Sequence, residues 1–187
     1  MNNNLPNWLE KHINIFDNEE IHHAFIISGS MGIGKSLLIE NLAEKILNNK
    51  ISLENNPDFH NLKILAEKKL IGINQIHELR DKLYESSFLG KNKVAVINEI
   101  EKISIDGLNA ILKILEEPPK NTYFLLSTNF LNQIPLTIQS RCFDIRISTP
   151  EITQSLEWLS DYQTKDALKA LEITNNLPIK AKHFLDN

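Results

Sequence analysis

One stretch of the chain, GSMGIGKS at residues 29–36, restricts the possible fold more than any other. It fits the pattern G-x-x-x-x-G-K-[ST] without a gap. The residues before it, 22–28, form a short apolar run that is typical of a buried parallel strand. After it, apolar residues at positions 38, 39, 42, 43 and 46 recur with the helical period. The sequence therefore predicts a strand, a glycine-rich loop and a helix in direct succession.

This loop has the composition that phosphate binding requires. Gly29, Gly32 and Gly34 allow successive backbone N–H groups to point into one concavity, and the start of the following helix adds partial positive charge. Lys35 can reach the β- and γ-phosphates of a nucleotide, and the Ser36 hydroxyl can ligate Mg²⁺. These residues therefore predict binding of ATP with Mg²⁺. The alternative is a glycine turn that fits the pattern by chance.

Strand and helix patterns alternate along most of the chain. Further strands are expected at residues 60–65, 93–98, 122–128 and 143–147. One helix is expected at residues 73–83, and another from the capping residue Ser104 to the prolines that follow residue 117. This alternation predicts an α/β fold: a five-stranded parallel sheet flanked by helices.

Only helical patterns follow Thr149. They cover residues 151–159, 164–172 and 178–185, and Pro150 is suited to the first position of a helix. We therefore expect a nucleotide-binding domain at residues 1–148 and an incomplete all-helical lid domain at residues 149–187.

Composition excludes several classes of protein. The longest apolar runs are four residues long, whereas a membrane span needs about 20. A single cysteine, Cys142, excludes a disulfide framework and a cysteine-cluster zinc site within the chain. These features predict a cytoplasmic protein. The net charge is −4, so DNA is expected to be met only within a larger assembly.

Two residues at the end of the strand expected at 93–98, Asn98 and Glu99, bear on hydrolysis. ATPases with this kind of loop carry an acidic pair there, and its second member orients the attacking water. Glu99 fits that role as a general base, although a solvated carboxylate at a strand end is the alternative. Asn98 replaces the first acid with a neutral amide, which cannot offset the charge of Mg²⁺. We therefore expect the chain's own ATPase activity to be weak or absent.

Several motifs resemble one protein family. The helix at residues 109–119, NAILKILEEPP, is similar to the N-A-L-L-K-x-L-E-E-P-P helix of bacterial DNA polymerase III clamp-loader subunits, which are AAA+ ATPases. Ser140, Arg141 and Cys142 resemble the S-R-C motif of the same subunits. Residues 71–80 and 57–59 resemble their I-x-V-D-x-I-R-x-L and H-P-D-F/Y segments. The delta prime subunits fit best, and the gamma/tau subunits fit less well.

The resemblance implies partners and roles. Clamp loaders are hetero-pentameric rings of gamma/tau, delta and delta prime subunits that place a sliding clamp on primed DNA. No membrane partner is expected. Arg141 would be an arginine finger that reaches the γ-phosphate of ATP bound by a neighbour; the alternative is an ordinary surface arginine. Thr128 falls at the position of a γ-phosphate sensor, or is a strand threonine chosen for its β propensity.

The chain departs from the family pattern in ways that favour a delta prime subunit with little hydrolysis. Residues 48–56 lack the four cysteines of the zinc module that many relatives carry, so we expect no zinc site. The lid arginine of active subunits is unmatched, and Lys180 is only a loose substitute. Asn98 is a further departure. The C-terminal collar domain of the family is expected to be absent from residues 1–187.

Two other interpretations remain open from the sequence. The chain could be an autonomous small P-loop ATPase or kinase that uses Lys35, Ser36 and Glu99 on its own, although residues 151–187 lack the arginine that a kinase lid normally supplies. It could also be a degenerate fragment that folds but has no role in replication.

Overall fold

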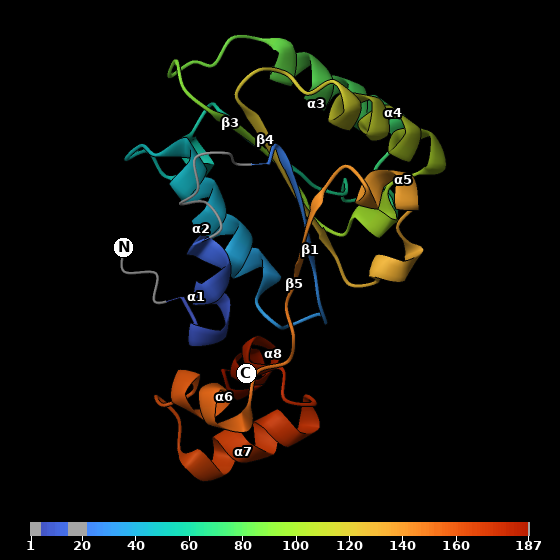
Figure 1. Cartoon of the computed structure of the whole chain (residues 1–187). Coiled ribbons are helices and arrows are strands. Elements are labelled where there is room, and N and C mark those ends of the chain that lie inside the picture. The colour runs from blue at the N-terminus through green and yellow to red at the C-terminus, as the bar shows by residue number, and fades with distance from the viewer. Residues whose placement is uncertain (1–4, 15–21, 187) are drawn as a thin grey trace.

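The centre of the molecule is a parallel β-sheet. The computed structural model describes residues 5–14 and 22–186. Among these residues the sheet has five strands in the order β2-β3-β4-β1-β5 (Figure 1). The strands are Ala24–Ser28 (β1), Phe59–Leu62 (β2), Lys93–Ile97 (β3), Thr122–Thr128 (β4) and Phe143–Arg146 (β5). The predicted five-stranded parallel sheet is confirmed.

Helices cover both faces of this sheet (Figure 1). One face is covered by α1 (Asn7–Ile13) and α2 (Lys35–Leu47), and the other by α3 (Ile73–Tyr84), α4 (Ile105–Glu116) and α5 (Leu136–Gln139). Short 3₁₀ turns lie in the loops at Leu53–Asn55 (η2), Ile100–Lys102 (η3) and Leu131–Gln133 (η4). Helices α6 (Ile152–Trp158), α7 (Thr164–Ile173) and α8 (Pro178–Leu185) pack together beyond one end of the sheet. Within the described residues, no helix is both long and apolar enough to cross a membrane.

The side chains of β1 explain why both faces are covered. All five residues of this strand are buried. Phe25 and Ile27 pack in a core cluster with residues of α1 and α2, whereas Ala24 and Ile26 pack in a second cluster with residues of α3 and α4. Successive side chains of a strand point to opposite faces, so a strand between two helical layers must be apolar throughout. The loop that follows β1 is therefore anchored from both sides.

Most elements lie close to their predicted positions. Strand β4 covers residues 122–128 as predicted, and Ser104 caps α4 because its Oγ accepts a hydrogen bond from the Gly107 N–H at 3.2 Å. Strand β2 ends at Leu62 rather than at residue 65, opposite Ile97, the last residue of β3. Strand β5 likewise ends at Arg146, opposite the last residue of β1.

The predicted placement of Pro150 in a helix is wrong. Helix α6 begins at Ile152 with Glu151 as its N-cap, and the Glu151 N–H is satisfied by Oε1 of Gln154 at 3.2 Å. Pro150 lies before this cap, and its carbonyl oxygen accepts a hydrogen bond from Asn176 Nδ2 at 2.6 Å. Helices α1 and α5 were not predicted; α5, with four residues, is too short to show a helical period.

The C-terminal helices have a core of their own. Its buried members are Leu159, Ala167, Ala170, Leu171 and Ala181. The Trp158 ring also meets the Trp8 ring edge-on, with 6.0 Å between centroids, and so links α6 to α1. A domain boundary at residue 149 stays a prediction, and its outer limits, residues 1 and 187, lie outside the described residues.

A buried carboxylate holds the loop that precedes β3. Asp58 is 1% exposed. It accepts hydrogen bonds from Ser87 Oγ at 2.8 Å and from the N–H groups of Phe88 at 2.9 Å and Leu89 at 3.0 Å. Burial alone would raise the pKa of Asp58, but the N–H groups of Leu89 and Phe88 and the Ser87 hydroxyl stabilise the charged form and bring the pKa below its ordinary value.

We predict that Asp58→Asn lowers the free energy of unfolding by about 1–3 kcal/mol at neutral pH, because one charged acceptor of three hydrogen bonds is lost. A lowered folded pKa stabilises the protein above the unfolded pKa of about 4, and this contribution disappears as the pH falls through the folded pKa. Urea unfolding between about pH 7 and pH 2 should therefore show the two proteins converging in acid. Asp81→Asn, at an exposed ion pair, is the control, and an equal effect from both variants would contradict this role.

Cys142 gives a second test of packing. It lies against the core cluster beneath α3 and α4, and burial raises the pKa of its thiol to about 12. Since the thiolate is the reactive form, we predict that iodoacetamide modifies the folded chain at pH 8 on the order of a hundredfold more slowly than the urea-unfolded chain. Cys142 is the only cysteine, so the mass of the intact protein reports the reaction. Equal rates in the two states would show that the thiol is accessible.

Candidate functional site

The glycine-rich loop connects the end of β1 to the start of α2, as the sequence predicts. Gly32 and Gly34 have φ angles of 88° and 106°. Residues that carry a side chain rarely adopt such positive φ angles. A Cβ on Gly32 would lie 2.8 Å from Cβ of Lys180, and one on Gly34 would lie 2.8 Å from Cδ1 of Leu9. The loop therefore needs glycine for its shape and because α8 and α1 approach it closely.

Backbone donors of the loop are free. Within the described part of the chain, the N–H groups of Met31, Gly32 and Gly34 have no hydrogen-bond partner. Gly34 forms the N-cap of α2, and the first turn of that helix has no acidic side chain to offset its positive end. Gly29 lets the loop backbone pass close to Ile147, since a Cβ at Gly29 would lie 2.8 Å from the Ile147 carbonyl oxygen. Free donors beside a helix start make an anion-binding cradle.

The Lys35 ammonium lies under this loop. The residue is buried, and its Nζ donates to the carbonyl oxygens of Gly29 at 2.8 Å and Ser30 at 3.0 Å, and to Oδ1 of Asn129 at 2.8 Å. Burial lowers the pKa of Lys35, and the negative charges of Glu101 and Glu99 oppose that shift. The lysine is thus held by loop carbonyls and by the residue that follows β4.

The two residues after β3 have different side-chain partners. Asn98 Oδ1 accepts a hydrogen bond from Ser127 Oγ at 3.2 Å, which ties the end of β3 to β4. Glu99 has a φ of 54°, in the left-handed region that residues with a side chain rarely adopt. Its Oε2 forms an ion pair with Lys102 Nζ at 2.9 Å. The strained backbone therefore presents a carboxylate beside the loop.

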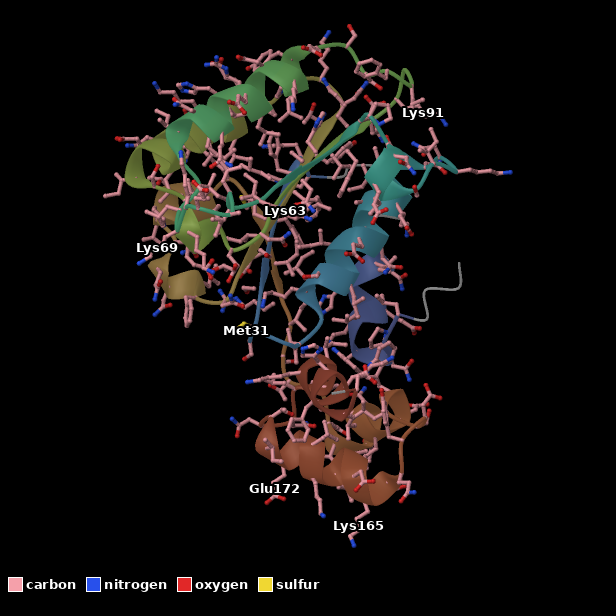
Figure 2. All side chains as sticks on the ribbon, turned by 180° about the vertical axis from the view of Figure 1, so that it is seen from behind. Met31, Lys63, Lys69, Lys91, Lys165 and Glu172 are labelled. Atoms are coloured by element: carbon pink, nitrogen blue, oxygen red, sulfur yellow. The ribbon has the colours of Figure 1, made fainter. Side chains whose placement is uncertain are left out.

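A pocket of about 520 Å³ lies where these elements meet. Its polar lining includes Lys35, Ser36, Asn98, Glu99 and Asn129. The loop, α2, β2 with its continuation, and α8 contribute apolar side chains: Met31, Leu37, Leu62, Ile64 and Ile179. Figure 2 shows Met31 at the end of the sheet that faces the C-terminal helices.

The chemistry of this pocket fits a phosphate-bearing ligand with a divalent cation. Ser36 is exposed, so its hydroxyl is free to face a metal ion held by phosphate oxygens. Among the residues described, no three His, Cys, Asp or Glu side chains gather into a metal site of their own. Any Mg²⁺ here would therefore depend on the ligand for most of its coordination.

The structure places the predicted sensor residue away from the pocket. Thr128 is fully buried, and its Oγ1 accepts a hydrogen bond from the Phe130 N–H at 3.0 Å. The next residue, Asn129, lines the pocket and contacts Lys35. Sequence reasoning also missed Glu101, whose Oε1 accepts hydrogen bonds from the N–H of Asn129 at 3.0 Å and from its Nδ2 at 3.3 Å. Asn129 and Glu101 could have been found from their positions shortly after a parallel strand, because ligands bind at the carboxyl ends of such strands.

Arg141 lies outside this pocket, after α5. Its guanidinium donates from Nη2 to Oε1 of Glu116 at 2.6 Å and from Nη1 to the Thr137 carbonyl at 2.7 Å. The Arg141 side chain is 34% exposed. The guanidinium is therefore held at the surface, with part of it accessible to another molecule.

Comparison with known proteins gives a consistent result. Residues 5–151 match the family model described as "DNA polymerase III, delta subunit". The DNA polymerase III subunit delta' of Buchnera aphidicola subsp. Schizaphis graminum is 30% identical over 197 aligned residues, which cover 95% of this chain and 60% of the relative. The DNA polymerase III subunit gamma of the same organism is 32% identical over 151 residues, which cover 72% of this chain and 40% of the relative. The chain thus spans 60% or less of the length of these relatives.

Solved structures agree on the fold. A gamma subunit-related protein of DNA polymerase III from Thermotoga maritima superposes with a TM-score of 0.66 at 23% identity, covering 89% of this chain and 58% of that one. This likeness confirms the predicted P-loop AAA+ fold. Since the family model covers most of the sequence, this chain belongs to the family described as DNA polymerase III, delta subunit.

Proposed function

We propose that this chain acts as a delta prime-type subunit of a DNA polymerase III clamp loader and offers Arg141 to a neighbouring ATP site. The observation that carries this proposal is the Arg141–Glu116 contact, which holds a partly exposed guanidinium at the surface. Family membership supports the same role. The partners are gamma/tau and delta subunits in a hetero-pentamer, and the sliding clamp and primed DNA are met through that complex in the cytoplasm.

The anchoring of Arg141 suits it to act on a second molecule. A guanidinium has several N–H donors in a rigid fork, which matches phosphate oxygens and stabilises charge that develops on them. Glu116 and the Thr137 carbonyl occupy part of the fork. The contact with Glu116 is an exposed ion pair, which contributes little to stability. Exchange of this carboxylate for a phosphate is therefore energetically accessible.

The chain's own loop is proposed to bind ATP with Mg²⁺. The free N–H groups at Met31, Gly32 and Gly34 would hold phosphate oxygens. Lys35 would leave its carbonyl acceptors for a phosphate, and Ser36 would face the Mg²⁺ ion. Bound Mg²⁺ would neutralise phosphate charge.

Hydrolysis by this chain is proposed to be weak or absent. Asn98 is neutral, and its side-chain oxygen accepts a hydrogen bond from Ser127 Oγ. The Glu99 carboxylate forms an ion pair with Lys102. Lys180 of α8 approaches Gly32 through its Cβ and backbone atoms. We infer from this contact that residues 149–187 act as a lid over a nucleotide-binding domain at residues 1–148.

The finger is tested by Arg141→Ala in a reconstituted complex with gamma/tau and delta subunits. We predict that ATPase activity falls on the order of tenfold or more, because arginine fingers contribute large factors to phosphoryl transfer. Nucleotide binding by this chain should stay unchanged. Arg80→Ala, at an exposed pair with Asp81, is the matched control. Full ATPase activity of the Arg141→Ala complex would rule out the finger.

The loop is tested by Lys35→Ala in the isolated chain. We predict that affinity for fluorescent ATP with Mg²⁺ falls roughly tenfold or more, since a charge-assisted contact to phosphate is lost. Lys165→Ala, far from the loop (Figure 2), should bind as the unchanged chain does. Turnover should stay at background in all three proteins. Turnover that Lys35→Ala abolishes would instead support an autonomous ATPase.

A further inference from the structure

Two carboxylates behind the phosphate loop converge on one amide. Glu101 Oε1 accepts from the backbone N–H of Asn129 at 3.0 Å and from its Nδ2 at 3.3 Å. Glu99 Oε1 accepts from the same Nδ2 at 3.4 Å. On the other side of the amide, Asn129 Oδ1 accepts from Lys35 Nζ at 2.8 Å. Asn129 therefore lies between an ammonium and two acids.

Only one orientation of this amide satisfies its neighbours. With Oδ1 toward Lys35 and Nδ2 toward the acids, each contact pairs a donor with an acceptor. The reverse orientation would place the NH₂ group against an ammonium and the oxygen against carboxylates. Lys35 Nζ, at 2.8 Å from Oδ1, favours this orientation on one side of the amide. On the other side, Glu101 makes the shorter of the two carboxylate contacts and also holds the backbone of Asn129, so it is the carboxylate that keeps this orientation when the ammonium turns to another acceptor.

Glu101 occupies this place at an energetic cost. Its second oxygen, Oε2, is buried and has no hydrogen-bond partner within the described residues. A buried acceptor without a donor destabilises a fold. The neighbouring Glu99 also has a left-handed backbone. Strained and unsatisfied groups that gather beside a pocket are a feature of functional sites.

We propose that Glu101 is a positioning residue, which acts through Asn129 by fixing its amide oxygen, rather than its NH₂ group, toward the lysine of the phosphate loop. An acceptor at this position meets phosphate oxygens with like partial charge. The γ-phosphate, which ATP has and ADP lacks and which Lys35 would reach together with the β-phosphate, would therefore gain less affinity than a donor would give it. This consequence rests on the proposed nucleotide binding, whereas the positioning itself does not.

The positioning is tested first without nucleotide. In the ¹⁵N-labelled chain, the side-chain amide signals of Asn129 are assigned by their loss in Asn129→Asp. Glu101→Ala should shift these signals toward those of exposed amides and speed their hydrogen exchange. Glu101→Gln should leave both nearly unchanged, because its amide oxygen accepts the same two hydrogen bonds. Unchanged signals in Glu101→Ala would overturn the proposal. Glu54→Ala, at an exposed residue, is the control.

The consequence is tested by the ratio of ATP affinity to ADP affinity, because a merely structural change moves both affinities together. Glu101→Ala should raise this ratio roughly three- to tenfold, the effect of one net hydrogen bond, as the freed amide donates to the terminal phosphate. Glu101→Gln should keep the original ratio. A rise in both variants would assign the effect to charge and overturn positioning. If the unchanged chain binds neither nucleotide, the proposed function fails, and the amide signals still decide the role of Glu101.

Discussion

The buried ammonium of Lys35 is the interaction on which the site depends. It joins the loop carbonyls of Gly29 and Ser30 to Asn129 at the end of β4. A buried lysine is tolerated only when its donors are satisfied. The two carbonyl oxygens and the Asn129 amide oxygen accept its hydrogen bonds, and the negative charges of Glu101 and Glu99 favour its charged form. The shape of the loop, the end of β4 and the turn after β3 are therefore one connected structure around a single positive charge.

Sheet topology makes this connection possible. Strands β3, β4 and β1 are adjacent in the sheet, although residues of other elements separate them in the sequence. Because the strands are parallel, their carboxyl ends lie at one edge, and Asn98, Asn129 and the loop after β1 meet there. The apolar cores on both faces fix the strands relative to one another. Packing on each side of the sheet thus sets distances in the pocket.

The sequence predicted the parts of this structure that depend on local pattern. Glycine spacing predicted the loop, apolar periodicity predicted α2 and β4, and a capping hydroxyl predicted the helix start at Ser104. Each of these signals lies within a few residues of the element that it predicts. The pairing of Asn129 with Lys35 joins residues 94 positions apart in the sequence, and no local pattern reveals it. Thr128 and Asn129 differ by one position, yet alternation along the strand buries one side chain and places the other in the pocket. The Arg141–Glu116 pair was unpredicted for the same reason, although each residue lies in a motif that the sequence analysis singled out.

Contacts of the loop with distant helices give its occupancy a structural consequence. Gly32 faces Lys180 of α8 and Gly34 faces Leu9 of α1, both at distances that leave no room for a methyl group. Trp8 adds a hydrogen bond from Nε1 to the Ile33 carbonyl at 3.0 Å and packs against Trp158 of α6. A shift of the loop backbone at Gly32 and Gly34 would therefore alter its contacts with α8 and α1. A ligand shifts a conformational equilibrium only through contacts that differ between its states. The close packing of Lys180 on Gly32 and of Leu9 on Gly34 ties the shape of the loop to the positions of α8 and α1.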